Sequence, residues 1–135
     1  MDRRQIEATL TAIYAARAAN DAAGILAHFA PSAAWRIAGD SGCCAMAQDY
    51  RGEALPAALG TMCALFQVQA LEPGPAIIDG PRAAVPVRAR FTFAPTGETV
   101  DTAMLDLWTF ADGQVQSVEE YLDTAHLARL SAAQT

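Results

Sequence analysis

The sequence predicts an α+β fold, with helices on one face of a curved antiparallel sheet. Apolar residues recur at helical spacing in the first half of the chain, whereas the second half alternates apolar and polar residues over long runs. One such stretch, residues 97–123, contains Asp112-Gly113, a dipeptide typical of tight hairpin turns. At 135 residues the chain is long enough for a sizeable core, and we expect one domain over residues 1–135.

The composition argues against several classes of protein. Hydrophobic residues make up 53% of the chain and charged residues 18%, a balance that argues against disorder. The net charge is −6 and no basic cluster is present, so we expect no nucleic-acid partner. All nine basic residues are arginine, which excludes a Schiff-base lysine and a P-loop lysine. No apolar run is long enough to span a bilayer, so we expect no membrane partner.

Cysteine and histidine usage argues against a disulfide framework and a metal site. The chain has three cysteines, and the adjacent pair Cys43 and Cys44 forms neither a disulfide pattern nor a Cys-x-x-Cys motif. We therefore expect a cytoplasmic location. His28 and His126 lie far apart without ligand spacing around them, so we expect no metal site and no cofactor.

The first helix should begin at a capping box formed by Asp2 and Gln5 and end near Asn20. Five residues recur at helical spacing along it, and the last of them is charged: Ile6, Leu10, Ile13, Tyr14 and Arg17. Asp21 can cap a second short helix over residues 22–29, which Pro31 follows.

A third helix is expected over residues 52–66. Pro56 lies in its first turn, where a missing N–H is tolerated. Its apolar stripe comprises Leu55, Leu59, Met62 and Phe66. A final short helix over residues 125–130 can be capped by Asp123 or Thr124.

Strands are expected at residues 34–37 and 82–93. Between them, residues 39–48 lack periodicity and predict a loop of the kind that often borders a cavity. Residues 76–78 lie between two turn signals, Pro73-Gly74-Pro75 and Asp79-Gly80-Pro81. In the strand 82–93, Arg88 and Arg90 face away from an apolar side made of Val85, Val87, Ala89, Phe91 and Phe93.

The hairpin over residues 97–123 carries the main functional signal. On its first strand, Asp106 shares a face with Thr102, Met104, Trp108 and Phe110. If that face is interior, a carboxylate lies on an apolar and aromatic wall, which raises its pKa. Asp106 is therefore a candidate catalytic acid, although a structural Asp106 bonded to a Trp or Tyr is an equal alternative.

Two registers of this hairpin place different glutamates near Asp106. A two-residue loop at Asp112-Gly113 sets Asp106 opposite Glu119. A three-residue loop with a bulge at Gly113 sets Asp106 opposite Val118, with Glu120 one pleat away on the same face. Either register brings a second acid close, and two carboxylates in an apolar site share a proton at neutral pH.

Segments along nearly the whole chain match one known family in order and spacing. These are residues 14–21, 24–26, Phe29, Trp35, 50–53, 106–110, Asp112-Gly113 and 120–123. The chain resembles the SnoaL-like, ketosteroid isomerase-like branch of the nuclear transport factor 2 (NTF2-like) superfamily. The resemblance implies an α+β cone, in which a curved antiparallel sheet and three helices from the N-terminal half enclose a hydrophobic pocket. It also implies a homodimer through the outer sheet face, where Arg88 and Arg90 would lie, and it favours the register with the Gly113 bulge.

The resemblance carries over to the catalytic residues only in part. Ketosteroid isomerase uses an Asp base and an oxyanion hole made of a Tyr and a protonated Asp. Asp106 matches the protonated Asp, whereas the tyrosine position falls on Ile13, with Tyr14 one residue later. The base position falls on Ile37, which cannot take a proton, so we expect no steroid isomerisation by that mechanism.

These observations lead to three hypotheses. The first is a cofactor-free isomerase, cyclase or dehydratase acting on a small hydrophobic carbonyl compound. Asp106, Glu120 and Tyr14 would be catalytic, and the substrate would contact Trp35, Tyr50, Phe66, Phe91 and Trp108. The second is non-catalytic binding of such a molecule, because Ile37 occupies the base position. The third is a dimeric interaction module whose cone is filled by side chains.

Overall fold

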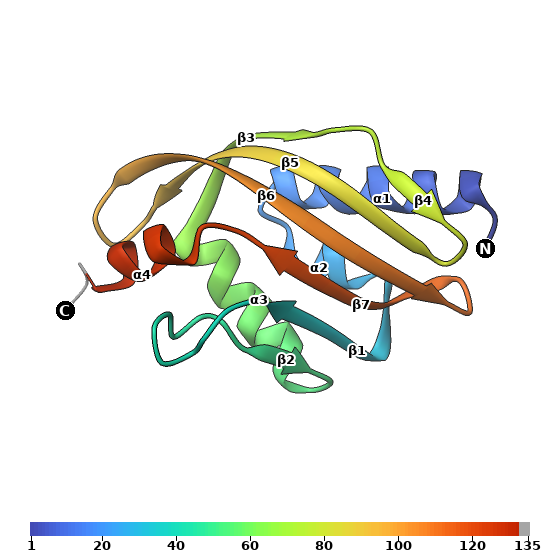
Figure 1. The fold of residues 1–135 in the computed structure, drawn as a ribbon, viewed down its shortest axis with the longest axis horizontal. Coiled ribbons are helices and arrows are strands. Elements are labelled where there is room, and N and C mark those ends of the chain that lie inside the picture. Colours follow the sequence, from blue (N-terminus) through green and yellow to red (C-terminus); the bar gives the residue numbers. More distant parts are fainter. Residues whose placement is uncertain (133–135) are drawn as a thin grey trace.

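The structure, a computed structural model, describes residues 1–132 and contains four helices and seven strands within them (Figure 1). The helices are α1 (Arg3–Ala18), α2 (Ala22–Leu26), α3 (Ala54–Leu65) and α4 (Thr124–Ala132). The strands are β1 (Phe29–Ile37), β2 (Asp49–Arg51), β3 (Phe66–Pro73), β4 (Ile77–Asp79), β5 (Arg82–Phe93), β6 (Glu98–Ala111) and β7 (Gln114–Tyr121).

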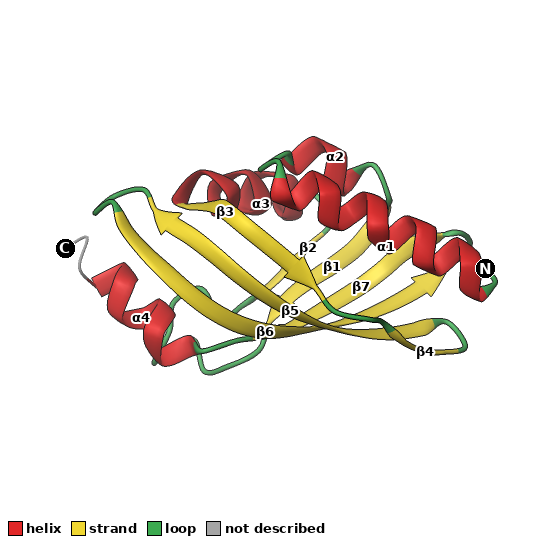
Figure 2. Cartoon of the chain, turned by 90° about the horizontal axis from the view of Figure 1, so that it is seen from above, coloured by secondary structure: helices red, strands yellow, loops and turns green. Residues whose placement is uncertain are grey.

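The strands form one curved sheet that confirms the predicted α+β class. The strand order is β2-β1-β7-β6-β5-β3, and β4 pairs with the N-terminal end of β5. All its strand pairs are antiparallel except β1 with β7, which are parallel. Helices α1, α2 and α3 lie together on one side of the sheet, and α4 lies at the opposite end of the molecule from the N-terminus (Figure 2). This arrangement leaves the inner face of β5 and β6 between the helices and α4.

Helix α1 is held at both ends by side chains identified in the sequence. Asp2 and Gln5 form the predicted capping box. At the other end Asn20 adopts a left-handed backbone with φ of 57°, which ends the helical run. The Asn20 side chain accepts a hydrogen bond from the Val68 N–H at 2.9 Å and donates one to the Val68 carbonyl at 3.4 Å. This pair of bonds ties the α1–α2 turn to β3.

Two predicted boundaries are wrong because sheet pairing starts earlier than the sequence indicates. Helix α2 ends at Leu26 rather than near Phe29, because Phe29 already pairs with Val115 as the first residue of β1. Pro31 lies inside β1, where the register with β7 shifts and a missing N–H is tolerated. Similarly, Phe66 begins β3 opposite Phe93 instead of ending α3, and β3 was not predicted at all.

The strand faces follow the predicted alternation. On β5 and β6 the inward residues are buried or half-buried, whereas Arg88 and Arg90 are exposed on the outer face. The core is centred on an aromatic cluster in which Trp108 meets Trp35 and Phe29 edge-on at 6.1 Å. Asp106 lies on the same inward face of β6 as Trp108 and is completely buried.

The hairpin register differs from the one that the family resemblance favours. The turn is a two-residue loop, because Ala111 pairs with Gln114, and Asp112 and Gly113 both have positive φ. The register then shifts by one residue on β7 at Gln116, a β-bulge between the Phe110–Val115 and Thr109–Ser117 pairs. As a result Asp106 lies directly opposite Glu120, so Glu120 points inward and Glu119 outward.

Candidate functional site

Asp106 is the centre of a buried polar cluster that joins α1 to the sheet. Tyr14 on α1 donates a hydrogen bond from its hydroxyl to Asp106 Oδ2 at 2.6 Å. The Tyr14 hydroxyl in turn accepts a hydrogen bond from Trp108 Nε1 at 3.1 Å. Tyr14 and Trp108 also pack edge-to-face, with ring centroids 5.9 Å apart. Asp106 is thus held on one side by Tyr14 and Trp108.

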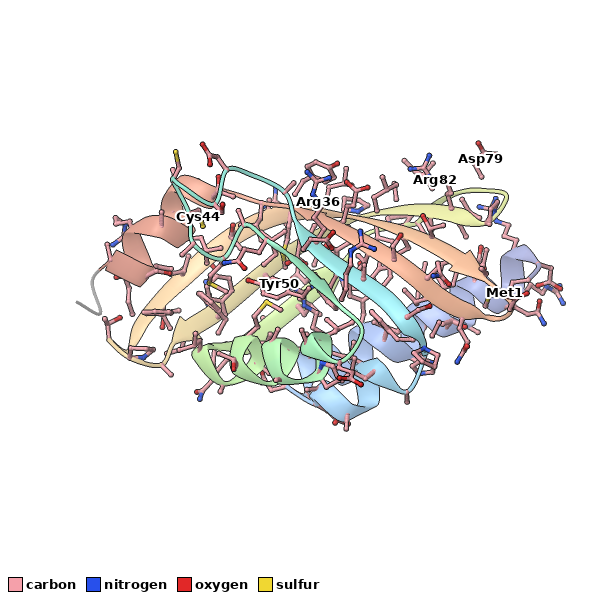
Figure 3. All side chains as sticks on the ribbon, turned by 90° about the horizontal axis from the view of Figure 1, so that it is seen from below. Met1, Arg36, Cys44, Tyr50, Asp79 and Arg82 are labelled. Atoms are coloured by element: carbon pink, nitrogen blue, oxygen red, sulfur yellow. The ribbon has the colours of Figure 1, made fainter. Side chains whose placement is uncertain are left out.

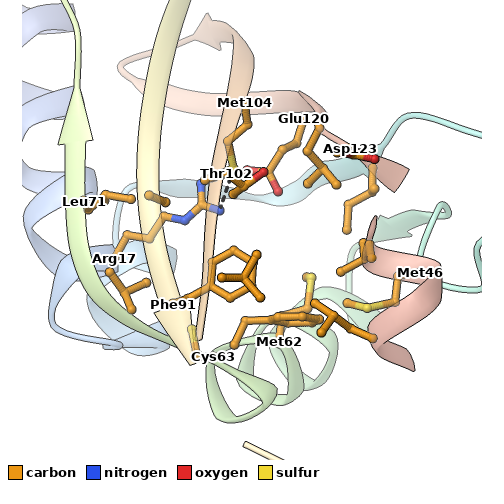
Figure 4. Close-up of a pocket in the computed structure, with 18 of the residues that line it drawn as sticks. Arg17, Met46, Met62, Cys63, Leu71, Phe91, Thr102, Met104, Glu120 and Asp123 are labelled. Carbon is orange, nitrogen blue, oxygen red and sulfur yellow. Dashed lines mark hydrogen bonds and ion pairs between the residues drawn. The ribbon is translucent and has the colours of Figure 1, made fainter. Parts of the chain in front are cut away.

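Arg17 lies between the two acids, one turn after Tyr14 on α1. Its Nη1 is 2.8 Å from Glu120 Oε2 and 3.3 Å from Asp106 Oδ2. Its Nη2 is 3.8 Å from the Met104 sulfur, and its guanidinium carbon is 5.5 Å from the centre of the Trp35 ring. Figure 4 shows the Arg17 side chain extending toward Glu120 and Met104. One cation therefore contacts two acids that face each other across β6 and β7.

Burial determines which of the two acids, Asp106 or Glu120, carries a proton. Burial raises the pKa of Asp106 well above its usual value, and the charge of Glu120 raises it further, against the opposing effect of Arg17. Asp106 Oδ1 is buried without a hydrogen-bond partner among residues 1–132, and an unpartnered carboxyl oxygen is less costly to bury when the group is neutral. We therefore assign a proton to Asp106 and a negative charge to Glu120, so that the cluster with Arg17 is neutral.

The same cluster fixes the charge states of its other members. Burial alone would lower the pKa of Arg17, but the neighbouring carboxyl groups, Glu120 first and then Asp106, raise it above the usual arginine value. Burial, with the neighbouring Asp106 carboxyl group, raises the pKa of the Tyr14 hydroxyl well above its ordinary range. Arg17 therefore stays charged and Tyr14 stays a neutral hydrogen-bond donor.

A cavity of about 90 Å³ lies beside this cluster, between β5, β6, α3 and α4 (Figure 4). Its wall is largely apolar, and the polar side chains on it include Arg17, Asn20, Thr102, Glu120, Asp123 and His126. Asp123 is exposed, so the wall reaches the protein surface near the start of α4. Three methionines line it, and their flexible side chains allow it to change shape: Met46, Met62 and Met104.

The residues proposed from the sequence occupy different positions relative to this cavity. Four of them line it: Glu120, Trp35, Phe66 and Phe91. Asp106 and Tyr14 are not part of its wall and lie behind Arg17 and Glu120, and Trp108 is fully buried with them. Tyr50 lies on the edge strand β2, where its hydroxyl donates to the Met46 carbonyl at 3.0 Å (Figure 3).

The structure adds residues that the sequence reasoning did not select. Arg17 is the most important of these. The sequence could have indicated it, because Arg17 continues the helical spacing of Ile13 and Tyr14 on the buried side of the helix. Met46 belongs to the loop over residues 39–48, which borders the cavity as expected of such a loop. His126 and Asp123 also line the cavity, and Asp123 caps α4 by accepting a hydrogen bond from the His126 N–H at 3.0 Å.

A second cavity, of about 410 Å³, lies between α1 and the segment 73–76. Although its volume is larger and Tyr14 lies on its wall, the exposed side chains of Arg3 and Glu7 form part of that wall, and neither Asp106 nor Glu120 reaches it. We therefore place the candidate site in the smaller cavity, where the ion-pair cluster is. Within residues 1–132, no three His, Cys, Asp or Glu side chains are grouped so that they could hold a metal ion. No helix in this part of the chain is long and apolar enough to cross a membrane.

Comparison with known proteins identifies the family. The model of the SnoaL-like domain matches residues 10–118, which is most of the chain. The chain belongs to the SnoaL-like domain family. The matched SnoaL-like segment includes Tyr14, Arg17 and Asp106 and ends two residues before Glu120. No curated protein matches the sequence significantly.

Solved structures place this SnoaL-like chain in the NTF2-like superfamily. An NTF2-like protein from Burkholderia xenovorans LB400 is 27% identical with a TM-score of 0.78, covering 96% of this chain and 98% of its own. An NTF2-like protein of unknown function from Burkholderia pseudomallei K96243 is 23% identical with a TM-score of 0.79, at the same coverage of 96% and 98%. TerC, crystallised with polyporic acid, is 24% identical with a TM-score of 0.78 over 93% of this chain and 96% of its own. These likenesses confirm the family resemblance and the fold.

Proposed function

We propose that this protein binds a small, hydrophobic, carbonyl-bearing molecule in the 90 Å³ cavity and performs cofactor-free acid–base chemistry on it. One observation carries the proposal: Glu120, one of two buried acids held by a single arginine, lies on a largely apolar cavity wall. The co-crystallisation of TerC with polyporic acid supports a ligand-binding role for this fold. The cavity is small compared with the roughly 300–1,000 Å³ of drug-sized sites, so a compound of at most one ring is the appropriate size class, and the methionines on the wall must move to admit it.

In this proposal Glu120 is the catalytic residue, because it is the buried acid on the cavity wall. Its carboxylate would accept a proton from the carbon next to the carbonyl group, and the electrons of the broken C–H bond would move to the carbonyl oxygen as an enolate. Once Glu120 is protonated, Arg17 no longer has a charged partner and can stabilise the enolate. Return of the proton from Glu120 to another carbon completes an isomerisation.

Asp106 and Tyr14 act through Glu120 rather than on the substrate. Asp106 faces Glu120 across the strand pair and keeps a proton available to it, while Tyr14 fixes the Asp106 carboxyl by its 2.6 Å hydrogen bond. Glu120 also pairs with Ile37 across β7 and β1. A carboxylate is therefore present beside the position at which the family resemblance expects a base.

Proton exchange into a ketone tests this function. In D₂O the wild-type protein should catalyse exchange of the α-protons of cyclohexanone, followed by proton NMR. Glu120→Gln should lower this rate by about 10²–10⁴-fold, the usual loss for a general base. Glu119→Gln is the matched control, because Glu119 points outward and pairs with exposed Arg36 at 3.7 Å. Equal exchange by wild type and Glu120→Gln would contradict the assignment.

Non-catalytic binding is the second candidate, and a specific observation favours it. Ile37 lines the cavity as an apolar residue at the position where the resemblance expects the base. This function predicts that cyclohexanone binds without any exchange above the buffer rate. The same NMR experiment distinguishes the two, because chemical-shift changes report binding and loss of the α-proton signal reports turnover.

A homodimer through the outer sheet face is supported by an exposed apolar row across three strands. Pro86, Leu105 and Tyr121 are register partners on β5, β6 and β7, and Leu105 and Tyr121 are 41% and 44% exposed. We expect the wild type to sediment as a dimer and Leu105→Arg as a monomer, because a charge there would be buried at the interface. A wild-type protein that is monomeric at all concentrations would rule this interface out.

A further inference from the structure

Arg17 is the only arginine or lysine on the cavity wall of the described chain, and the protein already surrounds it. Glu120 contacts Nη1 at 2.8 Å, Asp106 contacts the same nitrogen at 3.3 Å, and the Met104 sulfur lies near Nη2. The Trp35 ring lies 5.5 Å from its guanidinium carbon. An arginine in an apolar cavity would ordinarily be a binding site for a ligand carboxylate. Here the protein supplies that carboxylate itself.

The electrostatic balance of the cluster explains what a charged ligand would meet. Arg17 carries one positive charge, Glu120 one negative charge, and Asp106 holds its proton. The cluster therefore has no net positive charge to attract an anionic ligand. A ligand carboxylate at Arg17 would lie beside the Glu120 carboxylate, which is only 4% exposed, so water would screen their repulsion poorly. Asp123 adds a further negative group where the cavity meets the surface.

We propose that Glu120 determines the charge class of the ligand: it occupies the carboxylate position on Arg17 and restricts the cavity to uncharged carbonyl or hydroxyl compounds. This inference rests on the proposed function, since it concerns the same cavity, and it names the substrate class that function would use. It assigns Glu120 a role that exists whether or not the protein turns its ligand over.

Removing the Glu120 charge should open the position on Arg17. In Glu120→Gln, a bound carboxylate can pair with Arg17 while Asp106 keeps its proton, so the complex is neutral. In Asp106→Asn, by contrast, the Glu120 carboxylate stays on Arg17 and a ligand carboxylate is still repelled. The two variants alter neighbouring acids of one cluster, and only Glu120→Gln should strengthen anion binding.

The test uses benzamide and benzoate, which share a ring and a carbonyl group but differ in charge. Binding is measured by NMR chemical-shift titration at pH 7 for the wild type, Glu120→Gln, Asp106→Asn and the outward control Glu119→Gln. We expect benzamide to bind the wild type and benzoate to bind it at least about tenfold more weakly, as juxtaposed like charges require. Glu120→Gln should tighten benzoate binding by about tenfold or more, whereas Asp106→Asn and Glu119→Gln should leave it weak.

The possible outcomes separate this inference from the function on which it rests. If the wild type binds benzamide and benzoate equally well, the proposal that Glu120 selects uncharged ligands is wrong, but the proposal that the cavity binds a ligand is retained. The same conclusion follows if Glu120→Gln still binds benzamide but binds benzoate no more tightly than the wild type does. If neither benzamide nor cyclohexanone binds any form of the protein, the proposed function itself fails and the inference with it. Amide spectra of each variant, recorded in the same titration, show that the fold is retained.

Discussion

Replacing Arg17 with methionine should lower the free energy of unfolding by about 3–5 kcal/mol at pH 7, the usual cost of removing one partner from a buried ion pair. Methionine keeps most of the apolar stem of Arg17 but leaves Glu120 and Asp106 facing each other without a cation. Because the charged forms of both acids are then disfavoured in the folded state, the loss should shrink as the pH falls and the acids take up protons.

Urea unfolding at pH 7 and pH 5 measures this effect. Arg3→Met is the matched control, because Arg3 makes an exposed ion pair with Glu7 one turn along the same helix. Such surface pairs contribute little to stability, so this control should unfold close to the wild type at both pH values. If Arg17→Met were equally destabilised at pH 5 and pH 7, the loss would come from packing rather than from the unpaired acids.

Asp106→Asn should become more stable relative to the wild type as the pH rises. The native pKa of Asp106 lies above its unfolded value, so the folded state keeps the proton to higher pH than the unfolded state. The stability that Asp106 contributes is therefore complete below the unfolded pKa, near 3.8, and is lost as the pH rises toward the native pKa. Within that window each pH unit costs the wild type up to about 1.4 kcal/mol relative to the variant, which cannot ionise.

Asparagine is a suitable replacement because its amide resembles the protonated acid. Its carbonyl can accept the Tyr14 hydrogen bond, and its NH₂ group can face Glu120. Unfolding of both proteins from pH 5 to pH 8 gives the difference. Asp101→Asn is the control: Asp101 is exposed on the same strand, and hydrogen bonding to Arg90 lowers its pKa, so it stays ionised over this range and its stability difference should not change with pH. A wild type that gains stability over Asp106→Asn with rising pH would show that Asp106 is ionised.

Periodicity was enough to locate most elements and the inward face of β6. The long alternating runs gave β5 and the hairpin strands, and the capping box gave the start of α1. The strand β3 was missed because only some of its residues are half-buried and its pattern lacks clear alternation. What holds β3 in place is non-local: pairing with β5 and the side chain of Asn20. Neither contact can be read from the residues of β3 alone.

For the candidate site, the sequence pattern could predict which residues share one face of a strand, but not how different elements pack against one another. An acid on an aromatic strand face located Asp106, and the equal alternative of a structural bond to a Tyr or Trp matches its hydrogen bond to Tyr14. Which acid reaches the cavity depends on how α1 packs across β6 and β7, and no local pattern contains that information. Arg17 lies in front of Asp106 for this reason, so the acid at the cavity surface is Glu120.

The bulge at Gln116 has a consequence for comparing members of the family. It adds one residue between the hairpin turn and Glu120, and the pairing with Asp106 is reached only after that extra residue. In a homologue with a regular hairpin, the acid equivalent to Glu120 would stand one position nearer to the turn. An alignment drawn without a gap there would match Glu120 to an outward residue, and the inward acid would be recorded as absent from a protein that has it.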